Sequence, residues 1–212
     1  MKKILSTIFF GLFAFTQASA EVGVNVGISG NLGLFAASAK EVNAKTYKGS
    51  EHGAAGWGSI FVEKTLGDRL AIGVDYVPTA LETDQVETAK HDKTSSATAS
   101  SVTNKVQVDF EDLTTVYVAV NLSDSMYVKA GLAMVDVITN ESLGTGSKYG
   151  NADLDGAIVG FGTNKTLDNG MFIRTEASYM TFDGASITSG DNTVTLNQLD
   201  GVTAKLAIGK SF

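Results

Sequence analysis

Apolar and polar residues alternate with a period of two along most of the chain, and this pattern limits the fold more than any other feature of the sequence. Between residues 24 and 36, every second position is apolar or glycine, and the positions between them are small or polar apart from Phe35. Seven further segments show the same alternation. The eight expected strands are 24–36, 56–66, 69–78, 105–122, 126–139, 153–166, 171–182 and 198–212. No convincing helical period follows residue 20, so the pattern predicts an all-β protein.

The composition agrees with a chain built from hydrogen-bonded strands. The 212 residues include one proline, which cannot donate a ladder hydrogen bond, and no cysteine. The lack of cysteine excludes a disulfide-stapled domain, a thiol enzyme and a cysteine-ligated zinc module. A formal net charge of −7 gives no electrostatic basis for binding nucleic acid. After residue 20, no stretch approaches the ~20 consecutive apolar residues of a membrane-spanning helix, which excludes a helical membrane protein.

The first twenty residues have the features of an export signal. Lys2 and Lys3 precede an apolar run over 4–15, and Ala18-Ser19-Ala20 has the small-residue pattern of a signal-peptidase site. The alternative, an uncleaved anchor helix, is disfavoured because the apolar run is short for spanning a membrane. We therefore expect a signal peptide over 1–20 and an acidic mature protein, 21–212, that forms a single β-barrel domain.

The connections between the expected strands alternate in length. Three are tight turns with Gly, Asn or Asp, at 66–69, 121–125 and 167–170, and four are longer and polar, at 40–55, 81–104, 140–152 and 185–193. In an antiparallel meander, all long loops then lie at one end. Outer-membrane barrels have this asymmetry, with short periplasmic turns and long extracellular loops. The expected fold is an eight-stranded antiparallel up-and-down transmembrane β-barrel in the bacterial outer membrane.

Charged residues within the strands indicate which face is polar. Six lie mid-strand, in phase with small or polar neighbours, and they comprise three acids and three bases. A lipid-facing surface would tolerate none of them near the middle of the membrane, so we assign them to the barrel interior. The expected interior charges are Glu63, Asp75, Lys129, Arg174, Glu176 and Lys205. Because side chains can fill an eight-stranded barrel, paired charges predict a polar plug.

The same phase assigns the aromatic residues of the strands to one face or the other. Tyr76, Phe161, Tyr179 and Phe212 fall on the lipid-facing side, as interfacial girdles do, whereas Trp57 shares the interior phase of the charges. These rings could equally fill cross-strand pairs.

Within the second long loop, 94–101 is a Ser/Thr/Ala tract that cannot supply a core, and we expect it to be mobile.

The export signal, the eight alternating strands, the segregated loops and the terminal Phe212 together resemble the small outer-membrane β-barrels of the OmpA-like and OmpX-like, porin-family type. The resemblance covers 21–212 and rests on pattern. In that family, the last strand is an assembly signal for the barrel-insertion machinery. The resemblance implies that Lys205, Ala207 and Phe212 form this signal, while Lys210 departs from the family pattern. We expect a monomer surrounded by outer-membrane lipid.

No enzyme motif is present. His52 and His91 fall in expected loops, where either could meet a carboxylate such as Glu82 or Asp84, but solvated loop histidines are the favoured interpretation. The acidic loop residues match no twelve-residue calcium loop. We expect neither a metal site nor a cofactor.

Four hypotheses for function remain open on this sequence. The favoured one is a non-enzymatic outer-membrane barrel that stabilises the envelope and exposes a surface for adhesion or as a receptor. A narrow diffusion channel for small solutes and a barrel enzyme acting on lipid or peptide are the alternatives. A soluble lipocalin-like binder is disfavoured by the asymmetry of the loops.

Overall fold

The computed structural model describes residues 22–42, 46–92, 100–144, 148–189 and 192–212. The expected signal peptide, 1–20, lies outside these residues, as does most of the Ser/Thr/Ala tract, of which Ser100 and Ser101 belong to a strand. Within the described ranges, no helix is long and apolar enough to cross a membrane.

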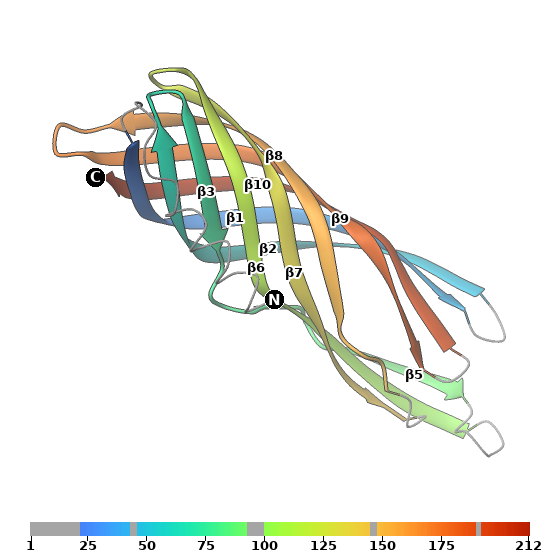
Figure 1. Cartoon of the computed structure of the whole chain (residues 1–212). Helices are drawn as coiled ribbons and strands as arrows, with labels where there is room; N and C mark the ends of the chain where they lie inside the picture. Colours follow the sequence, from blue (N-terminus) through green and yellow to red (C-terminus); the bar gives the residue numbers. More distant parts are fainter. Residues whose placement is uncertain (1–21, 43–45, 93–99, 145–147, 190–191) are drawn as a thin grey trace.

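The ten strands of the described residues form one antiparallel sheet that closes into a barrel (Figure 1). They are β1 (Val22–Val42), β2 (Thr46–Leu66), β3 (Leu70–Tyr76), β4 (Leu81–Glu82), β5 (Val86–Asp92), β6 (Ser100–Ser123), β7 (Met126–Leu143), β8 (Ala152–Thr166), β9 (Met171–Ser189) and β10 (Asn192–Ser211). Neighbours follow the order β3-β2-β1-β10-β9-β8-β7-β6, and pairing of β3 with β6 closes the ring. Because β4 and β5 also pair with β6, β3, β4 and β5 are pieces of one strand. The wall has eight strands, and the predicted eight-stranded antiparallel up-and-down barrel is confirmed.

The register shows how the wall is staggered. Following paired residues around the barrel from Leu34 leads back to β1 at Val24, a displacement of ten residues. The path runs through Val202, Tyr179, Val159, Ala130, Val118, Ile72 and Lys64. A staggered ring requires strands tilted to the barrel axis, and eight such strands enclose an interior that side chains can fill.

The two faces of the wall differ in polarity, with the apolar face outward. On β1, Ile28 and Leu32 are exposed outside, Leu32 to 69%, whereas Ser29 and Asn31 are buried inside. The exposed apolar residues continue around the barrel and are termed the apolar band. They include Val22, Val26, Ile28, Leu32, Leu34, Ile60, Val118, Val120, Val128, Leu132, Val159, Phe161, Ile173, Tyr179, Val202, Leu206 and Ile208. An apolar exterior around a closed ring is the arrangement that lipid requires.

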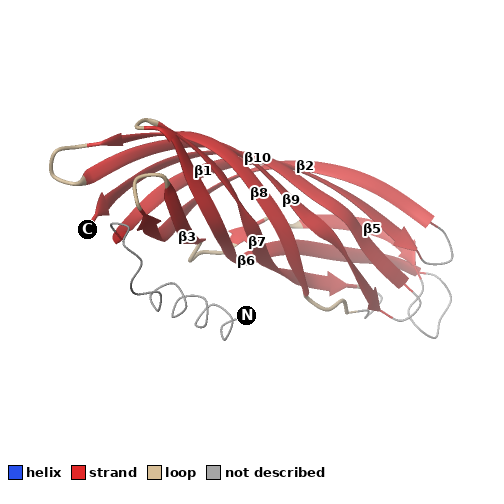
Figure 2. Cartoon of the chain, turned by 45° about the horizontal axis from the view of Figure 1, so that its top comes forward, coloured by secondary structure: helices blue, strands red, loops and turns tan. Residues whose placement is uncertain are grey.

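The two ends of the barrel also differ (Figure 2). One, termed the turn end, carries the tight turns at 67–69, 124–125 and 167–170 together with Phe212. At the other, termed the hairpin end, the strands continue well past the expected loop boundaries, so the predicted extent of the long loops was wrong. For example, β1 and β2 stay paired as far as Val42 and Thr46. In parts of the hairpin end, such as 46–55, most residues on both faces are polar or small, so the alternation is lost while the backbone ladder persists.

The wall is interrupted on one side of β2. Pairing of β2 with β3 ends at Ile60 and Tyr76, and residues 46–59 have no ladder partner on that side within the described part of the chain. Beyond Tyr76 the chain stays beside β6, through Val77 and then β4, but no longer pairs with β2, and Pro78, the only proline of the sequence, lies at this point. A proline cannot donate to the ladder, so the expected strand 69–78 ends at Tyr76. On β6, Asp112 has a φ of 54° beside a register shift. This interruption is termed the seam.

Candidate functional site

The structure places all six expected interior charges inside the wall and joins them in three ion pairs. The pairs are Glu63 with Arg174, Lys129 with Glu176, and Asp75 with Lys205. Each pair joins two strands that are not neighbours in the wall, so the pairs cross the interior. These six residues are termed the charge network.

Glu63 is the most deeply buried member of the network. Its side chain is 1% exposed, and its Oε1 lies 2.5 Å from Arg174 Nη1. Tyr117 donates a hydrogen bond to the same oxygen at 2.8 Å, and Asn25 donates to Oε2 at 2.9 Å. The guanidinium of Arg174 also lies 4.5 Å from the ring centroid of Phe172. Both carboxylate oxygens therefore have donors, which a buried charge needs.

Glu176 has the same arrangement on the other side of the interior. It accepts hydrogen bonds from Lys129, from Tyr127 at 2.8 Å and from Ser178 at 2.7 Å. Lys129 Nζ lies 5.0 Å from the ring centroid of Tyr117, which connects this pair to Glu63. The third pair, Lys205 Nζ to Asp75 Oδ2, has a distance of 2.5 Å.

Glycines make room for the two tyrosines that hold the carboxylates. A Cβ at Gly73 would lie 2.5 Å from Tyr117 Cζ, and a Cβ at Gly162 would lie 2.6 Å from Tyr127 Cζ. Any larger residue at either position would displace the ring, and with it the hydroxyl that satisfies a buried carboxylate. The close approach explains why these inward positions are glycine.

Towards the hairpin end, the interior changes from charged to apolar. A buried cluster, termed the apolar layer, fills this half and consists of Val77, Leu113, Ala133, Val135, Leu154, Ile158, Met180, Phe182 and Leu199. The expectation of a polar interior therefore holds only around the charge network. The two layers lie one after the other along the barrel, and both are packed with side chains.

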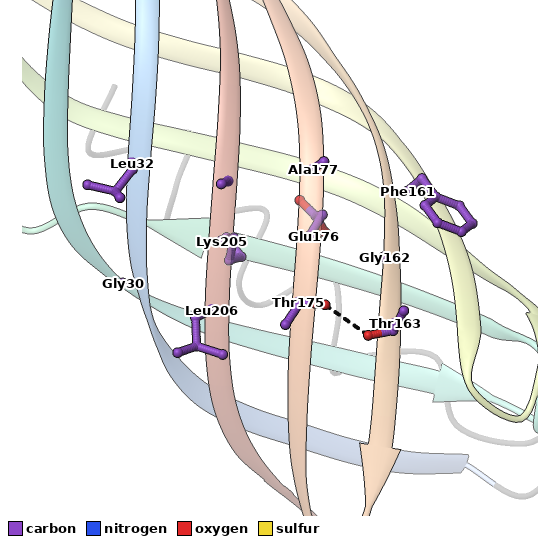
Figure 3. Close-up of a pocket in the computed structure, with 11 residues that line it drawn as sticks. Gly30, Leu32, Phe161, Gly162, Thr163, Thr175, Glu176, Ala177, Lys205 and Leu206 are labelled. Atoms are coloured by element: carbon purple, nitrogen blue, oxygen red, sulfur yellow. Dashed lines mark hydrogen bonds between the residues drawn. The ribbon is translucent and has the colours of Figure 1, made fainter.

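A shallow concavity of about 490 Å³ lies on the outer wall across β1, β10, β9 and β8 (Figure 3). Its lining includes the small residues Gly30, Ala177 and Ala204 beside Leu32, Leu206 and Phe161. The hydroxyls of Thr163 and Thr175 share one hydrogen bond at 2.8 Å, in which one donates and the other accepts, on this lipid-facing surface. Glu176 and Lys205 also line it, but both are committed to ion pairs in the interior. The concavity therefore presents an apolar surface without a free reactive group.

The candidate histidines are not assembled into a catalytic group within the described residues. His52 is exposed on β2, and His91 lies in β5, with its side chain outside what the structure describes. No cluster of His, Asp or Glu in the described ranges has the arrangement of a metal site.

Asp136 and Asp153 are cross-strand neighbours beyond the apolar band, where burial and the charge of Asp153 raise the pKa of Asp136.

The expected assembly-signal residues lie on and just beyond the closing strand. Ala207 is buried against Phe61 and Phe172, and Lys205 is in the charge network. Phe212 is 74% exposed at the turn end, where its backbone bonds to Val24. Ala207 and Lys205 therefore face the interior of the barrel, while Phe212 stays accessible.

Two groups of interior residues were missed from the sequence. Tyr117, Tyr127, Asn25 and Ser178 complete the charge network, and each lies on the inward phase that the charges define. That shared phase was the available signal. The apolar layer gave no such signal, because Leu and Ile read equally well as lipid-facing residues.

Comparison with known proteins bears on the fold. No protein-family model matches the sequence, and no curated protein is similar to it in sequence. The outer membrane protein OprG from Pseudomonas aeruginosa has a similar structure, with a TM-score of 0.51 at 14% identity over 89% of this chain and 95% of that chain. The chain has the fold of an outer-membrane β-barrel.

Two other solved barrels are more distant. The outer membrane protease OmpT from Escherichia coli has a TM-score of 0.47 at 6% identity, covering 94% of this chain and 99% of that one. Ail, the attachment invasion locus protein of Yersinia pestis, has a TM-score of 0.37 at 11% identity, covering 88% and 99%. At these identities, the likeness concerns the fold of the outer-membrane barrel and not an activity.

Proposed function

We propose that the chain is a bacterial outer-membrane protein that does not conduct solutes and does not catalyse a reaction. In this proposal it stabilises the envelope and acts at the cell surface, as a receptor or adhesin, through its hairpin end. The observation that carries the proposal is the filled interior. Three crossing ion pairs occupy one half, and the apolar layer occupies the other.

The exterior supports the same proposal. The apolar band suits a lipid environment. At the turn end it begins with Val22, the first residue of β1, whereas at the hairpin end β1 and β2 continue beyond Leu34 to Val42 and Thr46. Insertion by the barrel-assembly machinery belongs to the proposal, with Phe212 as the accessible part of the signal and Ala207 and Lys205 on the same strand.

Conductance tests whether the lumen is closed. The purified protein, with folding verified by a gel shift on heating, is expected to show no steady conductance in planar bilayers. The reason is that paired charges and the apolar layer leave ions no continuous aqueous path. Stable, ion-selective current steps from the unmutated protein would favour the diffusion channel instead.

Cysteine labelling tests the orientation, because the natural sequence has no cysteine. Lys48 lies at the hairpin end and Asp68 lies in a tight turn, and both side chains are exposed. Each is replaced by cysteine in a separate variant. A membrane-impermeant maleimide is expected to label Lys48→Cys on intact cells and Asp68→Cys only after the outer membrane is permeabilised. The reverse pattern would place the tight turns outside the cell.

A further inference from the structure

We propose that outward lysines at the turn end bind the phosphate of an anionic phospholipid, and that one acyl chain of this lipid lies in the concavity on the outer wall. The lysines are Lys165 on β8, Lys210 on β10 and Lys64 on β2, and they are termed the lysine row. The inference goes beyond the proposed function and takes from it only the leaflet, which is the periplasmic one in the proposed orientation.

The lysine row continues the outward face of the wall towards the turn end. Lys165 has the phase of the exposed Phe161 on β8, and Lys210 has the phase of the exposed Ile208 on β10. Both lysines are exposed, and neither is in an ion pair with another described residue. Lys64 is partly exposed on the outward phase of β2. A lysine in this position can lay its stem along hydrocarbon and hold its charge among the headgroups.

The lysine row lies at one level of the barrel, although its members are far apart in sequence. Because the ring is displaced by ten residues over eight strands, pairing steps from β8 towards β2 climb away from the turn end by slightly more than one residue each. Two such steps lead from Lys165 to Ile208, and Lys210 lies two residues closer to the turn end. Two more lead from Lys210 to Val62, and Lys64 again lies two residues closer. The three lysines therefore share one level, with about 12 Å between neighbouring Cα atoms.

The height of this level agrees with a membrane boundary. On β10, Asp200 borders the apolar band at the hairpin end, and Lys210 borders it at the turn end, ten residues later. With a rise of about 3.3 Å per residue and a tilt of about 40°, this segment spans about 25 Å, which is the height of the lipid-facing band of such barrels. Lys210 Nζ lies 5.5 Å from the ring centroid of Phe212, so this ammonium group lies towards the turn end and not towards the hydrocarbon.

The opposite boundary of the apolar band has the opposite charge. Among the described residues of β7 to β10, the outward charges at that boundary are all acidic, and each is next to a buried residue of the apolar layer. They are Asp136, Asp153, Asp155, Asp183 and Asp200. These carboxylates disfavour anionic headgroups, whereas the lysine row attracts them. The charges of the wall therefore select an anionic lipid at the turn end.

The concavity on the outer wall provides a place for an acyl chain (Figure 3). It begins at Thr163, two residues from Lys165, and follows the line of paired residues through Thr175 and Leu206 to Gly30. This line climbs from the lysine row towards the middle of the membrane. The hydroxyl that accepts in the Thr163–Thr175 hydrogen bond retains its own proton, which it can donate to an ester carbonyl of the lipid. A lipid with its phosphate at the lysine row can therefore lay one chain in the concavity.

A tryptophan reporter between the lysine row and the concavity tests the proposal. The reporter is Ile208→Trp in a Trp57→Phe background, because Trp57 is the only tryptophan of the chain. The mature protein is refolded into vesicles of equal parts phosphatidylcholine and phosphatidylglycerol, in which one lipid or the other carries bromine, a short-range quencher, on its acyl chains. Brominated phosphatidylglycerol is expected to quench the reporter more strongly. The preference for this lipid is expected to be about fivefold, as for one lysine near an anionic surface, and to fall at high salt.

Two controls separate the site from a general effect of charge. Val118→Trp in the same background lies on β6, four strands from β10 in either direction, and Val118 and Ile208 are 41% and 42% exposed. This control is expected to show a clearly smaller preference. Adding Lys165→Gln and Lys210→Gln to the reporter is expected to abolish its preference, whereas adding Lys48→Gln at the hairpin end leaves it unchanged. Equal quenching of the reporter by the two lipids, an equal preference at Val118→Trp, or a preference that survives both changes in the lysine row overturns the proposal.

Crosslinking provides a second measurement on the unmutated protein. Phosphatidylglycerol or phosphatidylcholine with a diazirine on one acyl chain is photolysed in vesicles of the same mixture. A higher yield of adducts on Thr163, Thr175 and Leu206 from phosphatidylglycerol supports the proposal, and equal yields from the two lipids overturn it. Labelling of Asp68→Cys on intact cells would overturn the proposed orientation and change only the leaflet, so the two failures are distinguishable.

Discussion

Arg174→Ala is expected to lower the free energy of unfolding by about 3–5 kcal/mol, because it leaves Glu63 charged, buried and without its cation. Glu63 is 1% exposed and keeps only the neutral donors Tyr117 and Asn25 after the change. Reversible denaturant unfolding in lipid vesicles, followed by the fluorescence of Trp57, measures the difference. A water-filled interior would screen the charge and reduce the cost to about 1 kcal/mol or less.

Lys105→Ala is the matched control for this experiment. Lys105 pairs with Glu87 at the same 2.5 Å, but the two side chains are 47% and 52% exposed. Exposed pairs contribute about 0.2–1 kcal/mol, so the control is expected to change stability little. Equal losses from the two variants would contradict a closed, dry interior around Arg174.

Leu206→Arg is expected to cost about 2–4 kcal/mol, because it places a charge on the lipid side near the middle of the apolar band. Leu206 is 61% exposed and pairs with Gly30, whose neighbours Ile28 and Leu32 are also exposed on β1. The outward residue paired with Leu206 on β9 is Thr175, a neutral group already hydrogen-bonded to Thr163, so the arginine meets no carboxylate there. The same denaturant titration in vesicles measures the loss.

Ser211→Arg is the comparison on the same strand. Ser211 is exposed at the turn end and pairs with Asn25. Ser211 is on the inward phase of β10, and because it is exposed at the turn end an arginine there can reach water, so we expect a cost of about 0–1 kcal/mol, as for charges near the membrane boundary. If Ser211→Arg destabilised as much as Leu206→Arg, the apolar band would not be the surface that contacts lipid.

The phase of the strands could be predicted from the sequence because lipid and the narrow interior select opposite kinds of side chain. Glu63 and Arg174 could be assigned to the interior from their phase alone, without knowing that they meet. The pairing itself could not be predicted, since it depends on the stagger of the closed ring. Outside the apolar band, as in 46–55, no such selection operates, and strands there looked like loops.

The seam could not be predicted for a related reason. Pro78 marks the end of a ladder, but a lone proline does not say which neighbouring strand the chain will then follow. Asp112 gave no sign of its left-handed backbone, because aspartate is also common in ordinary turns. Only the register, which ends at Ile60 and Tyr76, shows that the wall separates on the side of β2.

The charge network also has a consequence for the order of events in folding. Glu63 and Arg174 are 111 residues apart in sequence, and Asp75 and Lys205 are 130 apart. Their strands come face to face only when the sheet has curled far enough for β10 to meet β1. These two pairs are therefore absent from open intermediates and form with ring closure, whereas Lys129 and Glu176, on β7 and β9, are separated only by β8 and do not depend on it. Interactions that form this late mainly slow unfolding. The pairs Glu63–Arg174 and Asp75–Lys205 are therefore expected to lower the unfolding rate of the assembled barrel and so to prolong its lifetime.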